Sequence, residues 1–388
     1  MKVGFDVTPL TSPGAGVARY TLELLRALRD NEPRVDLALL TDHRPSDRAV
    51  AHELDALPRV RTPWAPTRAA WMQTALPAAL AREHVDLCHY TNYAAPVVSR
   101  VPSVVTLHDM SLVTNPEHHP RRRVMVLSSV LRVVARRARA VACPTQSARL
   151  DAIDVLGLDP RRVHVIPGAV APLFRRLPDA PAIDATLARY GIRPGYLLFV
   201  GTIEPRKNLL RLARAFATLR REGSDAQLVI CGRWGWKSRD LLPAIERLGI
   251  ADAVVFTRFV PDDDLVALLN RATAFVYPSL YEGFGLPIVE AFACGTPVVT
   301  SDRGATAEVA GSAALLADPT SDESLTDALR RVLSDATERD RLRAAGLARA
   351  ADFNRPNAAR QAVTVYEAVL GSRRSRTTGR VRSAARAR

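Results

Sequence analysis

The sequence of 388 residues lacks features that define several large classes of protein. It has no apolar run near the roughly 20 residues of a membrane-spanning helix, and its first ten residues, MKVGFDVTPL, contain no signal-peptide core. We therefore expect a cytoplasmic protein. Cysteine is scarce and no C-x-x-C pair occurs, so neither a disulfide framework nor a zinc site is indicated. The four cysteines should be small buried apolar residues: Cys88, Cys143, Cys231 and Cys294.

Aromatic residues are also few, at 6% of the chain, although the net charge is +14. A protein that binds nucleic acid through arginines usually interleaves them with aromatic side chains. The stretch from Gly371 to Arg388 holds seven arginines, no acidic residue and no aromatic residue. This composition predicts a disordered tail, and we expect no nucleic-acid partner.

A second group of arginines lies between Arg121 and Arg139 on a predicted helix. Apolar residues at helical spacing, such as Leu127 and Leu131, give this helix one buried face. Two interpretations stay open for the basic face. It is either a solvated surface or a surface that is attracted to anionic phospholipid head groups, which would make the protein peripheral on the inner face of the plasma membrane.

Short β-branched runs alternate with longer amphipathic stretches along the chain, which is typical of parallel sheets covered by helices. The length exceeds that of one ordinary domain, and a proline- and alanine-rich stretch over residues 167–194 interrupts the alternation. The fold class is therefore α/β, with two doubly wound, Rossmann-like parallel-sheet domains. The predicted strands cover residues 2–7, 35–41, 85–90, 103–107, 140–143 and 163–166, then 196–200, 227–231, 254–257, 274–277, 297–300 and 313–316.

We place the domains at residues 1–176 and 177–357, followed by a helix over residues 358–370 that crosses back to the first domain and by the tail, 371–388. Doubly wound sheets bind ligands beyond the carboxyl ends of their strands. Two such sheets that face each other would enclose a cleft. The chemistry should therefore lie on the loops that follow the strands.

Two of these loops carry suitable residues. After the first strand, Gly14 and Gly16 precede a helix, so backbone N–H groups can approach a ligand there, although a tight turn explains two glycines equally well. After the strand YLLFVG comes TIEPRKN, in which Arg206 and Lys207 provide two cations suited to a diphosphate. The alternative is an exposed basic turn capped by Asn208.

The most informative segment is YPSLYEGFGLPIVE, over residues 277–290. It reads as a strand end, a glycine-rich loop and a helix with Pro287 near its first position. The loop can hold a sugar against bare backbone. Glu282 precedes the helix and Glu290 is expected in its first turn, where an acid either binds ligand hydroxyls or simply complements the helix dipole.

The segment GTIEPRKN together with SLYEGFGLPIVEAFACGTPVVTS resembles the donor domain of retaining GT-B glycosyltransferases of the large family four. Further stretches that resemble the family cover nearly the whole chain: GVARYTLELL, LPAAL, TLHD, IPGAVAPLF and CGRWGWKS. The resemblance implies a GT-B fold, a nucleotide-sugar donor and a saccharide or polyprenyl-linked acceptor. It implies no cofactor and no metal.

The resemblance also implies a role for each matching residue. Glu290 would hold the ribose hydroxyls of the nucleotide, and Glu282 would hold the donor sugar together with the backbone around Phe284 and Gly285. Arg206 and Lys207 would grip the diphosphate. Further members of the implied site are Leu286, Thr202, the loop at Gly14 and Gly16, and His108, which resembles a cleft histidine near the donor sugar.

The sequence departs from the family pattern at two places. Thr202 stands where many relatives have a second phosphate-binding arginine, and Pro167-Gly168 stands where the family has Asn-Gly. The implied mechanism is a front-face retaining transfer, in which Lys207, Arg206 and helix N-termini stabilise charge on the departing diphosphate. A double displacement would need a carboxylate nucleophile, for which Glu282 is the candidate, and neither route requires a metal.

The donor is expected to be GDP-mannose, because the motifs most resemble bacterial mannosyltransferases of polysaccharide assembly. The alternatives are another nucleotide-sugar donor, a nucleotide-sugar epimerase or a phosphorylase on the same architecture, and a basic nucleic-acid-binding protein. The epimerases and phosphorylases lack this E-x7-E context.

Overall fold

The computed structural model describes residues 1–11, 16–178 and 181–386, which fold into two units. The N-terminal unit comprises residues 1–113, 122–169 and 354–388, and the C-terminal unit comprises residues 114–121 and 170–353. Apart from the short segment 114–121, the chain passes between the units at 169/170 and 353/354, a few residues before the expected boundaries at 176/177 and 357/358. In the C-terminal unit the N–H of Val170 donates to the carbonyl of Phe353 at 2.9 Å, so the two crossing points lie side by side.

The N-terminal unit contains one parallel sheet of six strands in the order β2-β1-β3-β4-β5-β6. Its central strands are buried, because helices cover both faces of a doubly wound sheet. In the register, Val3 lies opposite Leu37 on one side and Leu87 on the other. The strands are β1 (Lys2–Asp6), β2 (Asp36–Leu40), β3 (Leu87–Tyr90), β4 (Ser103–Thr106), β5 (Ala140–Cys143) and β6 (Val163–Val165).

The helices of this half of the chain bury one apolar stripe each, as Tyr20, Leu24 and Leu28 do on α1. The helical stretch from Arg68 to Leu80 is irregular, because Pro77 has no N–H for the helical ladder and a π-helical turn precedes it. The elements are η1 (Thr8–Thr11), α1 (Gly16–Asn31), α2 (Arg48–Asp55), α3 (Arg68–Ala70), η2 (Trp71–Ala75), α4 (Leu76–Leu80), α5 (Ser111–Thr114), η3 (Pro116–His118), α6 (Arg121–Arg137), α7 (Gln146–Leu156) and η4 (Pro160–Arg162).

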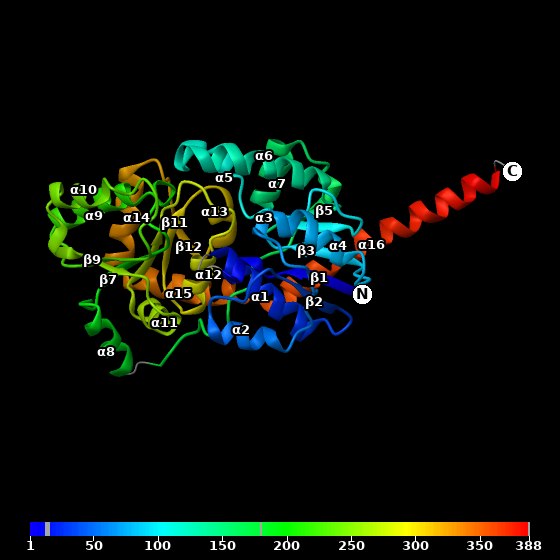
Figure 1. Ribbon diagram of the computed structural model, residues 1–388. Coiled ribbons are helices and arrows are strands. Elements are labelled where there is room, and N and C mark those ends of the chain that lie inside the picture. The colour runs from blue at the N-terminus through cyan, green and yellow to red at the C-terminus, as the bar shows by residue number, and fades with distance from the viewer. Residues whose placement is uncertain (12–15, 179–180, 387–388) are drawn as a thin grey trace. The chain divides into compact units, whose positions relative to one another are not determined.

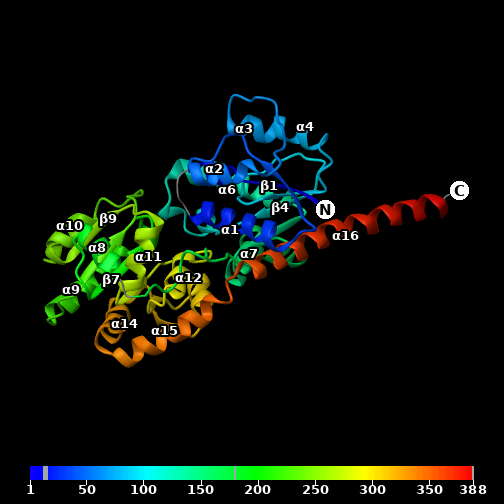
Figure 2. The same cartoon turned by 90° about the horizontal axis from the view of Figure 1, so that it is seen from below.

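The last helix, α16 (Arg355–Arg386), packs beside α1 (Figures 1 and 2). Arg355 pairs with the buried Glu23 at 2.8 Å, and the Tyr366 hydroxyl lies 2.7 Å from Nδ1 of His89. These contacts attach the start of α16 to the N-terminal unit. The helix continues through residues 371–386, where the sequence predicts disorder.

The C-terminal unit also contains one parallel sheet of six strands, in the order β12-β11-β10-β7-β8-β9. The strand order reverses between β7 and β10, which are neighbours. Loops that follow strands at such a switch point diverge to opposite faces and leave room for a ligand. The strands are β7 (Tyr196–Val200), β8 (Gln227–Cys231), β9 (Val254–Arg258), β10 (Ala274–Tyr277), β11 (Val298–Ser301) and β12 (Ala314–Ala317).

Helices α9 and α14 lie side by side in this unit, as do α12 and α15 (Figures 1 and 2). The stretch expected to be a linker, 167–194, contains helix α8, which opens on Pro181, a residue that fits the first helical position. The elements are α8 (Pro181–Arg189), η5 (Pro205–Lys207), α9 (Leu209–Arg221), α10 (Leu241–Arg247), η6 (Ala251–Ala253), α11 (Asp262–Arg271), α12 (Leu286–Ala293), α13 (Gly304–Ala310), α14 (Asp322–Ser334) and α15 (Ala336–Ala350).

The loops that leave β7 and β8 touch through backbone at two glycines. A Cβ on Gly232 would stand 1.9 Å from the carbonyl oxygen of Gly201, closer than any two such atoms can approach. Only glycine fits at position 232, and the main chain of the β8 loop rests directly on the main chain of the β7 loop. The segment that carries Arg206 and Lys207 therefore begins from a fixed point.

Candidate functional site

The two loops at the switch point of the C-terminal sheet carry the charged residues that the sequence singled out. Arg206 and Lys207 follow β7, and Glu282 follows β10. The loops are joined through backbone, because the N–H of Leu280 donates to the carbonyl of Arg206 at 2.8 Å. Residues 75 positions apart in the sequence thus form one cluster. We call it the Lys207 cluster: Glu204, Arg206, Lys207, Tyr277 and Glu282.

Lys207 is the buried cation of this cluster, with only 6% of its surface exposed. Its ammonium donates to Glu282 Oε1 at 2.5 Å and to the Tyr277 hydroxyl at 2.6 Å, and it lies 4.7 Å from the centre of the Tyr277 ring. Burial lowers the pKa of Lys207, and the Glu282 carboxylate opposes that effect. The lysine is therefore held in one position by a carboxylate and an aromatic ring.

Arg206 occupies the other side of the same carboxylate. Its guanidinium donates to Glu282 Oε2 at 2.8 Å, to the Tyr281 carbonyl at 2.9 Å and to Glu204 Oε1 at 2.9 Å. Burial works to raise the pKa of Glu282, but Arg206 and Lys207 outweigh it and hold that pKa at about 2. Glu282 is ionised at every physiological pH. Tyr277 and Glu204 also belong to the cluster, although the motifs that contain them assign them no role.

The alternative of an exposed basic turn capped by Asn208 is wrong. Lys207 is buried, and the Asn208 side chain makes no helix-capping hydrogen bond. Its amide instead donates to the carbonyls of Pro278 and Pro319, at 3.1 and 2.7 Å. Asn208 has φ of 61°, a left-handed conformation that asparagine tolerates better than most residues. It ties the β7 loop to two further loops of the unit.

Helix α12 begins one residue after Gly285, whose φ of 106° favours glycine. Pro287 lies in its first two positions, as predicted. Glu290 is the fifth residue of the helix, so the expectation that it lies in the first turn is wrong. Because the helix-dipole effect is confined to the first turn, it does not explain this acid. Glu290 is 3% exposed, a position that charged residues rarely occupy without a partner.

The other predicted donor-site residues of this unit differ in exposure. Phe284 and Leu286, on either side of Gly285, are almost fully buried, and Phe284 packs edge-on against Phe353. Their side chains build the loop, which leaves its backbone as the part available to a ligand. Thr202 is exposed at the start of the β7 loop.

The N-terminal unit holds the remaining predicted site residues. Gly14 lies outside the described residues, and Gly16 is the first residue of α1. His108 follows β4, and its Nε2 lies 2.8 Å from the carbonyl of Thr91. A carbonyl only accepts, so Nε2 carries the proton and Nδ1 presents a lone pair. Burial lowers the pKa of His108, which favours this neutral form.

Asp6 is a residue of this unit that the sequence analysis missed. It is the last residue of β1 and is fully buried. Oδ1 accepts from the N–H of Thr8 at 2.9 Å, whereas Oδ2 makes no hydrogen bond to any described residue. Burial raises the pKa of Asp6 from 3.8 to about 7, with smaller opposing effects from Thr8 and Arg68. An aspartate at the end of an apolar strand is the only sequence signal that could have indicated it.

This raised pKa predicts how stability depends on pH. Above pH 3.8 the unfolded chain loses the Asp6 proton while the folded chain keeps it, so the free energy of unfolding falls as the pH rises to about 7. We expect Asp6→Asn to remove this slope and to raise the free energy of unfolding at pH 8 by about 1–3 kcal/mol. Urea unfolding at pH 5 and pH 8 measures it. The exposed Asp36→Asn is the control, and an unchanged slope in Asp6→Asn would refute the assignment.

The described residues offer no metal centre, since no three His, Cys, Asp or Glu side chains among them group as ligands would.

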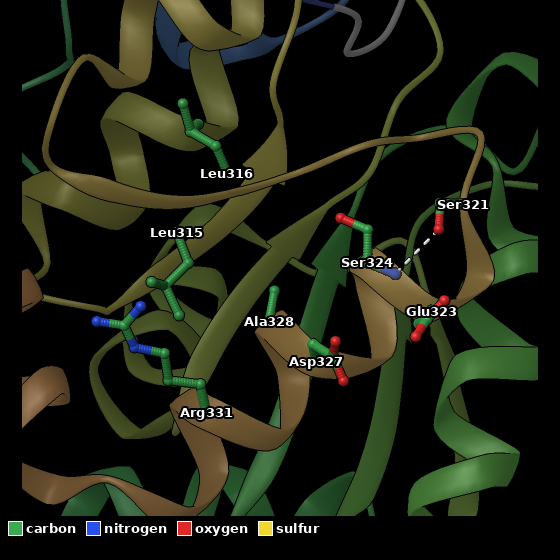
Figure 3. A pocket seen from close by; sticks show the side chains of 8 residues that line it. All are labelled: Leu315, Leu316, Ser321, Glu323, Ser324, Asp327, Ala328 and Arg331. Carbon is green, nitrogen blue, oxygen red and sulfur yellow. Dashed lines mark hydrogen bonds between the residues drawn. The ribbon is translucent and has the colours of Figure 1, made fainter.

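A hollow of about 450 Å³ lies between the edge strand β12 and helix α14 (Figure 3). Its charged side chains are Glu323, Asp327 and Arg331, and the two carboxylates outnumber the single cation, which disfavours a diphosphate there. All four cysteines are free and buried, as predicted.

The chain belongs to the glycosyltransferases of family 4. Residues 14–172 match the family described as "Glycosyltransferase Family 4", and residues 189–349 match "Glycosyl transferases group 1". The first match covers strands β2 to β6 and the second covers the whole C-terminal sheet, and the enzyme has the GT-B fold. The predictions of the fold class and of a glycosyltransferase are confirmed.

Among its relatives is the O-antigen chain mannosyltransferase B of Escherichia coli, 31% identical over 95% of this chain and 100% of that protein. The 2-deoxystreptamine glucosyltransferase of Streptomyces kanamyceticus is 31% identical over 79% of this chain and 84% of that protein. In structure, Anabaena HepE in complex with UDP and glucose superposes with a TM-score of 0.74 at 22% identity, covering 95% of this chain and 99% of HepE.

Proposed function

We propose that this glycosyltransferase transfers mannose from GDP-mannose to a saccharide or lipid-linked saccharide, with retention of the anomeric configuration. The Lys207 cluster carries the proposal, because it places two cations and a carboxylate on the switch-point loops of a family member. The mannosyltransferase from Escherichia coli, similar over its whole length, supports mannose as the sugar. Because another relative is a glucosyltransferase, a different nucleotide sugar is the second candidate donor.

In the proposed complex Glu290 binds the ribose hydroxyls, and Glu282 binds the sugar with the backbone at Phe284 and Gly285. Arg206 and Lys207 face the diphosphate. Both cations already share Glu282 as a partner, so their positions are set before the donor arrives. Such preorganisation reduces the cost of reorienting charges during the reaction.

In the proposed mechanism the acceptor hydroxyl oxygen bonds to the anomeric carbon on the face from which the diphosphate departs. The bond from that carbon to the phosphate oxygen breaks, and the leaving phosphate takes the hydroxyl proton. Lys207 and Arg206 stabilise the negative charge that develops on the phosphate. His108, held as the neutral tautomer, accepts a hydrogen bond from a hydroxyl through Nδ1.

Glu282 is a poor candidate for the nucleophile of a double displacement. Both of its oxygens bind cations, and its pKa of about 2 makes it a weakly basic carboxylate. The front-face route uses the same residue as a sugar ligand and an anchor for the cations. The configuration of the product, determined by proton NMR of the anomeric signal early in the reaction, tests retention, and a β-linked product from an α-linked donor would refute it.

We expect transfer to be independent of divalent metal, because Lys207 and Arg206 can supply the charge that magnesium supplies in other enzymes. The initial rate should be the same with excess EDTA and with added Mg²⁺. A rate that EDTA abolishes and Mg²⁺ or Mn²⁺ restores would contradict this assignment of the two cations.

We further propose that helix α6 docks on an anionic membrane surface, where a lipid-linked acceptor would be found. Its inner face is buried at Leu131 and Val134, whereas Leu127, which the sequence also placed on this face, is only half-buried. Its outer face exposes Met125, Val130 and Val133 among exposed arginines, and Val98 is exposed on a neighbouring loop that Arg137 contacts. Apolar residues interspersed with arginines suit the boundary between head groups and acyl chains. Among the described residues no helix has the length and apolarity to cross a bilayer.

The double variant Met125→Ser/Val133→Ser should bind vesicles containing anionic lipid about tenfold more weakly than the wild type, because two exposed apolar side chains no longer insert. Co-sedimentation with vesicles of graded phosphatidylglycerol content measures this. The control is Leu210→Ser/Leu242→Ser, which alters two similarly exposed leucines of the C-terminal unit. Equal binding by both double variants would rule out α6 as the docking surface.

A further inference from the structure

A cavity of about 680 Å³ lies in the C-terminal unit at the edge of the sheet opposite to the Lys207 cluster. Gly195, Ala226 and Thr273 line it, and each directly precedes a strand: β7, β8 and β10. Because all strands of this sheet are parallel, these positions mark its amino edge, whereas Arg206 and Glu282 follow strands at the carboxyl edge. The cavity is therefore separate from the proposed donor site, and its size suits a small molecule.

Among the described residues, four arginines line this cavity against a single carboxylate, that of Asp225. They come from three different parts of the unit: Arg176 from the segment before α8, Arg271 from the end of α11, and Arg339 and Arg343 from α15. Segments distant in the sequence thus bring like charges together. Such a concentration of positive charge is costly unless an anion offsets it.

Carbonyl oxygens orient two of these guanidinium groups without neutralising them. Arg339 donates to the carbonyls of Val332 and Leu333, at 3.0 and 2.8 Å, and Arg343 donates to the carbonyl of Gly295 at 3.2 Å. These neutral acceptors help to hold both side chains in place and do not cancel their positive charge.

Two arginines of the lining also form ion pairs with carboxylates outside it. Arg343 pairs with Asp340, whose side chain is 73% exposed, and Arg271 pairs with Asp184, whose side chain is 59% exposed. Exposed ion pairs of this kind are weak and screened by salt, so the lining stays positive.

Arg176 is brought to the cavity by a side-chain clamp. The Asn270 side chain accepts from the N–H of Leu177 at 2.8 Å and donates to the carbonyl of Arg175 at 3.0 Å. Both bonds hold the segment around Arg176 against α11. A Cβ on Gly295 would lie 3.5 Å from the Arg343 side chain and 3.7 Å from that of Arg176, so the two arginines converge on this glycine.

We propose that this arginine-lined cavity binds a small phosphate-bearing anion. It would be a second site, at the amino edge of the sheet, whereas the proposed donor site lies at the carboxyl edge. Guanidinium groups recognise phosphate oxygens with paired N–H donors, and several arginines around one cavity would bind a phosphate group from several sides. The ligand is either inorganic phosphate or pyrophosphate, or an organic phosphate ester of similar size.

Calorimetric titration with phosphate, pyrophosphate and glucose 6-phosphate at constant ionic strength tests the proposal. We expect Arg339→Gln/Arg343→Gln, and separately Arg176→Gln, to weaken binding by about tenfold or more. Arg221→Gln/Arg247→Gln removes two exposed arginines of the same unit elsewhere and should bind as the wild type does. Circular dichroism and thermal melts confirm that each variant is folded, and the exposed Arg176 gives a variant that leaves the core intact.

Tighter binding of glucose 6-phosphate than of phosphate would identify an ester as the ligand, and equal or weaker binding would identify the inorganic ion. The proposal fails if the cavity variants bind all three anions as the wild type does. It also fails if Arg206→Gln abolishes pyrophosphate binding completely, because that result would place the anion at the donor site.

Discussion

Replacing Lys207 by methionine should lower the rate of glycosyl transfer by about two to three orders of magnitude, whatever the donor. Methionine keeps most of the volume of the lysine stem but removes the buried charge that Glu282 and Tyr277 hold in place. Stabilisation of the departing diphosphate would be lost mainly in the transition state, so kcat should fall more than KM rises. Initial rates over a range of donor concentrations measure both constants.

Lys2→Met is the matched control, because Lys2 lies in the N-terminal unit and its ammonium pairs with the half-exposed Glu83. It should leave kcat unchanged. A second effect is expected in Lys207→Met: with one cation fewer, the pKa of Glu282 should rise from about 2. If Lys207→Met retained the full kcat, the cluster would not stabilise the leaving group and the proposed mechanism would be wrong.

Gly232→Ala should lower the free energy of unfolding of the C-terminal unit by about 2–4 kcal/mol. The new Cβ would overlap the carbonyl oxygen of Gly201, and both contact points are backbone, so no flexible side chain can move aside. The β7 and β8 loops would have to separate, which would also displace the Lys207 cluster. Urea unfolding and the transfer rate should therefore change together.

Gly249→Ala is the control for this steric effect, because it strains a positive-φ backbone without creating a clash. Gly249 has φ of 68°, and no neighbouring atom lies within 4 Å of the position that an alanine Cβ would take, so its substitution strains the backbone alone. We expect a loss of about 1 kcal/mol and an unchanged transfer rate. Equal losses of stability in the two variants would show that the contact between Gly232 and Gly201 has no special weight.

The sequence predicts the sheets well because buried parallel strands are short apolar runs bounded by loop residues. All twelve strands form, with ends within two residues of the predicted ones, and β5, β7, β8 and β10 match at both ends. Local apolar patterning predicts strands but not their order. The pairing of β7 with β10 depends on crossover connections, which no short window of sequence contains.

The errors concern segments whose structure depends on context. Helix α8 lies within a stretch that proline content marked as a linker, because Pro181 begins a helix rather than breaking one. A π-helical turn precedes Pro77 in the helical stretch, and apolar periodicity does not predict such a turn. Glu290 was placed one turn too early because the expected start of α12 was not fixed by a capping side chain.

The sequence predicts which residues belong to the candidate site but not which of them contact one another. The motifs indicated Arg206, Lys207 and Glu282 as separate ligands of diphosphate and sugar. In the structure Arg206 and Lys207 also both bind Glu282, and Tyr277 contributes a hydroxyl and a ring to Lys207. Pairing between residues 75 positions apart, and the isolation of Asp6 at the end of β1, follow from the packed sheet and have no local signature.

The most direct test of the proposed function is calorimetric binding of nucleotide sugars. GDP-mannose should bind more tightly than UDP-glucose or UDP-GlcNAc, Glu290→Ala should abolish the binding, and the exposed Glu246→Ala should retain it. Equal affinity for all three donors, or unchanged GDP-mannose binding by Glu290→Ala, would contradict the proposed donor and the proposed role of Glu290.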